Sequence, residues 1–96
     1  MRRNKSLPLG DVLRSFLREE GLETPLNEYR LVQAWPEVMG EVISNYTGNI
    51  GIRNCTLYVQ IKSPALRQNL MMGRAEMIQK LNAHVGAQVI NNIVLY

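Results

Sequence analysis

The spacing of the apolar residues changes near residue 47 from a helical period to a two-residue alternation. In the first part, apolar side chains at three- and four-residue intervals predict an amphipathic helix over Leu9–Glu20. In the second part, Leu57, Val59 and Ile61 alternate with more polar neighbours, as expected of a half-buried strand. Helices followed by strands are typical of an α+β fold, in which helices cover one face of a sheet.

Proline and glycine residues predict where the next helices begin and end. Thr24 and Pro25 favour a helix start, because Thr can accept from free amide groups and Pro loses no hydrogen bond at the first helical position. Pro36 lacks an amide hydrogen, so we expect this helix to break or kink sharply at Trp35 and a short third helical stretch to start at Pro36. Gly40 lies inside that third helix, where a glycine indicates close packing against another backbone.

Two neighbouring alternating segments predict a β-hairpin. The first strand covers Thr47–Arg53, and a turn at Arg53-Asn54 joins it to the second strand. Cys55 then opens the second strand on its inward side, where a free cysteine behaves as a small buried apolar residue. Tyr58 points to the opposite side, toward solvent or a ligand.

A long helix follows the hairpin. Ser63-Pro64 favours its start and Gly86 its end. In a straight helix, Arg67 and Arg74 would both lie within the apolar arc, which is costly for charged groups. Either a bend near Met72-Gly73 or extension of the two side chains to solvent resolves this conflict, and the sequence leaves both open.

The last segment, Gln88–Tyr96, reads as a strand with apolar residues on both sides. This pattern indicates either a central position in the sheet or pairing with another chain. The 96 residues have room for one core only. We therefore expect a flexible basic lead over residues 1–8 and a single domain over residues 9–96, with N-terminal helices followed by β-β-α-β, and a three-stranded sheet with helices on one face.

The residue inventory argues against catalysis. The chain has one cysteine and one histidine, and it contains no phosphate-binding loop and no hydrolase or metalloprotease motif. His84 lies near a helix end, where a surface or capping role is expected. We therefore predict no catalytic residues, no metal, no cofactor and no small-molecule substrate. No apolar run approaches the roughly 20 residues that span a bilayer, so a cytoplasmic protein without a membrane partner is expected.

The distribution of charge favours an anionic partner. Residues 11–53 hold four basic and seven acidic side chains, whereas residues 54–96 hold four basic side chains and one acidic one. Phosphate binding needs several cations on one face, and exposed aromatic rings can stack on bases. The candidate nucleic-acid-binding residues are Arg53, Tyr58, Lys62, Arg67, Arg74 and Lys80, with Arg2, Arg3 and Lys5 as a mobile electrostatic arm.

Four segments in order resemble one known family. They are Leu31-Val32-Gln33-Ala34-Trp35-Pro36-Glu37-Val38-Met39-Gly40, Thr56-Leu57-Tyr58-Val59, Ser63-Pro64-Ala65-Leu66-Arg67-Gln68-Asn69-Leu70, and Leu81-Asn82-Ala83-His84-Val85-Gly86. Together they resemble the DciA family (domain of unknown function 721) over about residues 9–96.

The resemblance implies a KH-like domain that works with the bacterial replicative DNA helicase. It implies a helicase loader that has affinity for single-stranded or forked DNA, with RNA also possible, and that hydrolyses no ATP itself. Six positions match motif positions of the family that look structural: Trp35, Gly40, Leu57, Leu70, Leu81 and Gly86.

Two other functions remain open on the sequence. The first is an RNA-binding module of translation or ribosome maturation, although Gly73 alone does not supply the GXXG loop of a KH clamp. The second is a protein-only interaction domain that uses the acidic first half or the closing strand.

Overall fold

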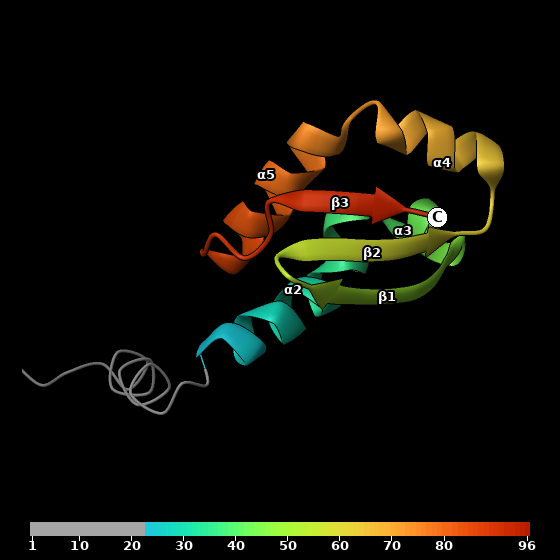
Figure 1. The fold of residues 1–96 in the computed structure, drawn as a ribbon. Helices are drawn as coiled ribbons and strands as arrows, with labels where there is room; N and C mark the ends of the chain where they lie inside the picture. The colour runs from blue at the N-terminus through green and yellow to red at the C-terminus, as the bar shows by residue number, and fades with distance from the viewer. Residues whose placement is uncertain (1–22) are drawn as a thin grey trace, which may run out of the picture.

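The computed structural model describes residues 23–96 (Figure 1). The predicted lead over residues 1–8 and the predicted helix Leu9–Glu20 lie outside the described residues. The elements in chain order are α2 Glu23–Met39, α3 Glu41–Asn45, β1 Thr47–Arg53, β2 Thr56–Ile61, α4 Pro64–Met71, α5 Arg74–Val85 and β3 Asn92–Leu95. This order confirms the predicted α+β class, with helices first, then two strands, a helical crossover that consists of α4 and α5, and a third strand.

The three strands form one mixed sheet in the order β1-β2-β3. The hairpin pairs β1 and β2 antiparallel, and the helical crossover returns β3 parallel to β2. In this register, Tyr58 of the central strand lies between Gly51 of β1 and Val94 of β3. Figure 1 shows α2 and α3 behind the sheet, so the helices cover one face and leave the other uncovered by any described element.

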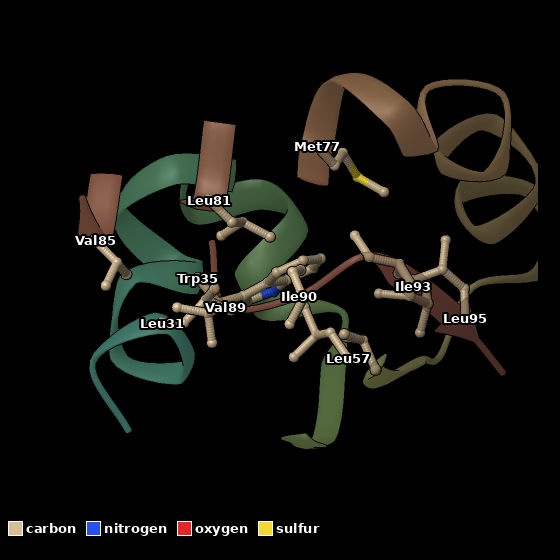
Figure 2. Packing of buried hydrophobic residues seen from close by; sticks show 12 residues of the cluster. Leu31, Trp35, Leu57, Met77, Leu81, Val85, Val89, Ile90, Ile93 and Leu95 are labelled. Carbon is tan, nitrogen blue, oxygen red and sulfur yellow. The ribbon is translucent and has the colours of Figure 1, made fainter. Parts of the chain in front are cut away.

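The core lies between the sheet and the helix layer (Figure 2). Leu57, Val59 and Ile61 of β2 are fully buried, in agreement with the alternation seen in the sequence. On the helix side, Trp35 of α2 and Leu81 of α5 pack against them. Burial of one such aliphatic side chain stabilises the fold by about 1.5–3 kcal/mol.

The predicted start of a third helix at Pro36 is wrong. Helix α2 continues through Pro36 and ends at Met39. The proline removes one backbone hydrogen bond, but the buried Trp35 beside it holds this turn of helix in the core. Tertiary packing therefore outweighs the local cost of the proline.

Gly40 is the residue that ends α2. Its φ of +95° lies in the region that side-chain-bearing residues avoid. A Cβ built on Gly40 would have nothing within 4 Å, so the expectation of close backbone packing at this glycine is also wrong. The glycine is needed for its backbone conformation, which redirects the chain into α3.

The expected burial of Cys55 is wrong as well, because Cys55 is exposed. Arg53 pairs with Thr56, so the hairpin turn consists of Asn54 and Cys55. Both have positive φ, 51° and 60°, as a two-residue turn of the I′ type requires. The turn lies one residue later than predicted, and the buried side of β2 begins at Leu57.

The closing strand is shorter than Gln88–Tyr96 and lies at an edge of the sheet. Val89 and Ile90 are both buried although they precede β3. Their apolar character, which is also typical of a two-sided strand, comes from a buried connection. The side chain of Asn82 holds this connection: its Oδ1 accepts from the backbone N–H groups of Val89 and Ile90 at 3.0 and 3.1 Å, and its Nδ2 donates to the Ile90 carbonyl at 2.8 Å.

The sequence left open whether the helix after Ser63 bends near Met72-Gly73, and in the structure it is interrupted there: α4 ends at Met71 and α5 begins at Arg74. The Ser63 hydroxyl accepts from the Leu66 N–H at 3.3 Å and caps α4 as predicted. Gly86, with φ of +83°, ends α5 in the left-handed conformation.

Candidate nucleic-acid interface

The uncovered side of the sheet, here called the open face, carries every second residue of the three strands. Leu57, Val59 and Ile61 point to the helices, so their neighbours along β2 point away from them. The pairing register extends this face to the adjoining strands. The open face consists of Asn49, Gly51, Arg53, Thr56, Tyr58, Gln60, Asn92, Val94 and Tyr96.

A shallow depression of about 460 Å³ lies on the open face near the hairpin. It is lined by Asn49, Ile50, Gly51, Ile52, Arg53, Tyr58 and Tyr96. Gly51 pairs with Tyr58 across the two strands, and a Cβ built on Gly51 would meet nothing within 4 Å. The missing side chain of Gly51 therefore leaves open the space beside the Tyr58 ring.

Two tyrosine rings border this depression. Tyr58 is 39% exposed and Tyr96 is 50% exposed. Both polar backbone groups of Tyr96 form hydrogen bonds with β2. Its N–H donates to the Val59 carbonyl at 3.0 Å, and its carbonyl accepts from the Ile61 N–H at 2.8 Å. Both rings are thus carried on hydrogen-bonded backbone of the sheet.

Tyr58 is predictable as a candidate binding residue from the sequence, and Tyr96 is not. The alternation of β2 alone shows that Tyr58 points away from the core. The position of Tyr96 depends on the parallel pairing of β3 with β2, which no local pattern reveals. The one available signal was that Val94 and Tyr96 share a side opposite to Ile93 and Leu95.

The open face carries no Asp or Glu. In the described part of the chain, all acidic side chains belong to the helices α2, α3 and α5. Arg53 stands at the hairpin end of the face, beside the depression. The Gln60 side chain accepts from the Asn49 backbone N–H at 3.1 Å, at the irregularity of β1 between Thr47 and Ile50. The charge on this face is therefore compatible with a phosphate.

The other predicted cations do not gather at this place. Lys62 follows β2 at the end opposite to Arg53, about 20 Å along the strand from Thr56 at 3.3 Å per residue. Arg67 of α4 is half-buried, and its Nη1 donates to the Ile61 carbonyl at 2.9 Å. Part of the Arg67 guanidinium is therefore engaged in holding α4 to the end of β2.

Arg74 and Lys80 lie on α5, in the helix layer. Both are exposed, and the Lys80 ammonium lies 3.8 Å from the Glu76 carboxylate. The structure thus brings Arg53 together with Tyr58 and places Lys62, Arg67, Arg74 and Lys80 elsewhere. Arg2, Arg3 and Lys5 lie outside the described residues, and binding by all these side chains stays a prediction.

The remaining chemistry-bearing residues form no larger cluster within residues 23–96. His84 Nε2 lies 3.2 Å from Glu37 Oε1, a surface contact that links α5 to α2. In the same range, no group of three or more His, Cys, Asp and Glu side chains could hold a metal ion. No helix in this part of the chain has both the length and the apolar character needed to cross a bilayer.

Comparison with known proteins identifies the family. A family model described as "Dna[CI] antecedent, DciA" matches residues 8–95, which is nearly the whole sequence. The chain belongs to the DciA family. Individual relatives are also similar to most of this chain. A "UPF0232 protein" of Mycolicibacterium paratuberculosis (strain ATCC BAA-968 / K-10) is 29% identical over 86 residues, or 90% of this chain and 48% of the relative.

Two further relatives give the same result. A UPF0232 protein of Mycobacterium leprae (strain Br4923) is 27% identical, and one of Rhodococcus jostii (strain RHA1) is 26% identical; each match covers 90% of this chain and 46% of the relative. The chain therefore spans about half the length of the relatives it matches.

The six DciA motif positions that are expected to be structural are separate from the open face. Trp35, Leu57 and Leu81 are buried in the core, and the two glycines adopt positive φ. None of the six positions expected to be structural belongs to the open face: Trp35, Gly40, Leu57, Leu70, Leu81 and Gly86. In this DciA domain, these six positions and the candidate binding surface are thus different sets of residues, although Thr56 and Tyr58 of the open face belong to the resembling segment Thr56-Leu57-Tyr58-Val59.

Proposed function

We propose that this DciA domain is a non-enzymatic accessory of DNA replication. In this proposal it binds the replicative DNA helicase in the cytoplasm and assists its loading, and it contacts single-stranded or forked DNA. The proposal assigns no catalytic residue and needs no cofactor. The observation that carries it is the match of the family model to residues 8–95, whose description names a Dna[CI] antecedent.

The open face supports the nucleic-acid part of the proposal. It combines an exposed aromatic side chain, Tyr58, with Arg53 and lacks acidic residues. Aromatic rings and arginine side chains on one surface are typical of proteins that bind unpaired nucleic acid. The helix layer, which carries all the described acidic side chains, is less suited to a phosphate backbone.

The helicase part of the proposal is tested by direct binding. The purified domain is immobilised and the replicative helicase of the same organism is passed over it at near-physiological salt. Both proteins are treated with nuclease, so that DNA cannot bridge them. We expect saturable binding of the helicase. No binding under these conditions would contradict the proposal.

A competition experiment separates DNA from RNA as the nucleic-acid ligand. A labelled single-stranded DNA is bound to the domain, and unlabelled DNA or a structured RNA is added as competitor. We expect the unlabelled DNA to displace the label at lower concentration. Displacement by structured RNA at a much lower concentration would favour the RNA-binding alternative instead.

A further inference from the structure

We propose that the depression on the open face is a binding site for unpaired nucleotides. In this site, bases stack on Tyr58 and Tyr96, and the Arg53 guanidinium contacts a phosphate. The inference rests on the proposed function and goes beyond it, because it names the surface, adds Tyr96, and restricts the ligand to nucleotides whose base faces are free.

The relative positions of the two rings support this. Tyr58 of β2 pairs with Val94 of β3. Tyr96 follows Val94 by two residues, so it lies on the same face of the sheet as Val94 and Tyr58. Diagonal neighbours of this kind in a sheet are about 7–8 Å apart, which is within reach of aromatic side chains. Both rings are at least one-third exposed. A sheet that presents aromatic rings in this way can stack successive bases.

The space beside Tyr58 also fits a base. Gly51 leaves the adjoining position on β1 unfilled, and the resulting depression of about 460 Å³ is within the range of small-ligand sites. A planar base can enter such a shallow hollow from solvent and lie against the Tyr58 ring. A larger residue at position 51 would fill that space without removing any existing contact.

The charge around the depression favours binding of a nucleotide over binding of a peptide of arbitrary sequence. Arg53 and the uncharged Asn49 both line the depression, and Arg53 pairs with the uncharged Thr56 across the hairpin. Because no Asp or Glu lies on the described strands, a phosphate at Arg53 meets no acidic side chain of the sheet. Base faces are accessible in single strands and are stacked within a duplex, so the site selects unpaired nucleic acid.

The test measures fluorescence anisotropy of a dye-labelled, mixed-sequence DNA of about a dozen nucleotides, single-stranded or as a blunt duplex. Four variants are compared with the unchanged protein: Tyr58→Ala, Tyr58→Phe, Gly51→Val and Tyr29→Ala. The last is the matched control, because Tyr29 is an exposed tyrosine of α2, in the helix layer. Circular dichroism and thermal unfolding establish that each variant is folded.

We expect the single strand to bind more tightly than the duplex. Tyr58→Ala should weaken single-strand binding by about 5- to 150-fold, the range for removal of one base–aromatic stack. Gly51→Val should weaken it comparably, since it blocks the depression. Tyr58→Phe keeps the ring and should stay within about twofold of the unchanged protein, and Tyr29→Ala should have no effect.

Three results would overturn the inference. They are equal affinity for duplex and single strand, undiminished binding by folded Tyr58→Ala and Gly51→Val, and loss of helicase binding but not of DNA binding in those variants. The last result would assign the open face to a protein partner. Helicase binding by the unchanged domain is measured separately, so failure of this site is distinguishable from failure of the proposed function.

Discussion

The indole Nε1 of Trp35 donates a hydrogen bond of 2.9 Å to the Thr47 hydroxyl, and Thr47 in turn donates to the Ile43 carbonyl at 2.9 Å. These two bonds connect the last turns of α2 to α3 and to the start of β1. The Trp35 ring is 2% exposed, so its N–H has no access to bulk water and depends on Thr47. This pair therefore fixes the first strand of the sheet on the helix layer.

Substitution Thr47→Val tests this connection. Valine keeps the branched shape and β-propensity but leaves the Trp35 N–H without an acceptor in the core. We expect the free energy of unfolding to fall by about 1–3 kcal/mol, measured by urea denaturation. Thr56→Val is the control, because the Thr56 hydroxyl makes only an exposed contact of 3.4 Å. Equal effects of the two substitutions would show that the Trp35–Thr47 bond contributes nothing specific.

Substitution of two glycines by alanine should have different effects on the stability of the fold. Gly40→Ala forces a side chain onto a backbone with φ of +95°, and we expect a loss of about 1–3 kcal/mol in stability. Gly51→Ala places a Cβ in open space within a strand, so stability should be unchanged or slightly raised. The midpoints of thermal unfolding of the two variants provide the comparison. A destabilised Gly51→Ala would mean that the strand needs a glycine at this position for another reason.

Asn82 should be among the least replaceable polar residues of the domain. Its buried amide satisfies two backbone N–H groups and one carbonyl of the connection before β3. Asn82→Ala leaves these groups without partners, and we expect a loss of about 3 kcal/mol or more of stability. Asn69→Ala, on the exposed surface of α4, is the control and should change stability by less than about 0.5 kcal/mol. A tolerated Asn82→Ala would contradict this role.

The cations outside the open face can be tested through the salt dependence of DNA binding. If Arg67 and Arg74 neutralise phosphates of a single strand, changing both to Ala reduces the magnitude of the salt slope by about 0.7 for each phosphate concerned. Unfolding is measured alongside, because Arg67 also bonds the Ile61 carbonyl. Arg30→Ala, an exposed change on α2, serves as control. An unchanged slope in the double variant would remove both residues from the site.

Strong local patterns predicted the fold well. The alternation around Leu57, the cap at Ser63 and the glycine at 86 each act through neighbouring atoms, and the structure contains all three features. The errors arise where distant parts of the chain decide. Burial of Trp35 keeps α2 helical through Pro36. The side chain of Asn82 holds in the core a connection whose sequence resembles that of a strand.

The candidate site was predictable only in part, for the same reason. Tyr58 could be assigned to a side of its strand from the sequence. The depression beside it needs Gly51 from β1 and Tyr96 from beyond β3, and both follow from strand pairing. The sequence has its candidate cations close together along the chain, but the crossover through α4 and α5 separates Arg74 and Lys80 from Arg53.

Amide chemical-shift mapping of the isotope-labelled domain tests the central claim most directly, namely that this domain joins the replicative helicase to nucleic acid. A single-stranded oligonucleotide is added first and the helicase second. We predict shift changes on β1, β2 and β3 around Tyr58 in the first step, and a further set of changes or line broadening in the second. Spectra that do not respond to the helicase at near-physiological salt would contradict the account.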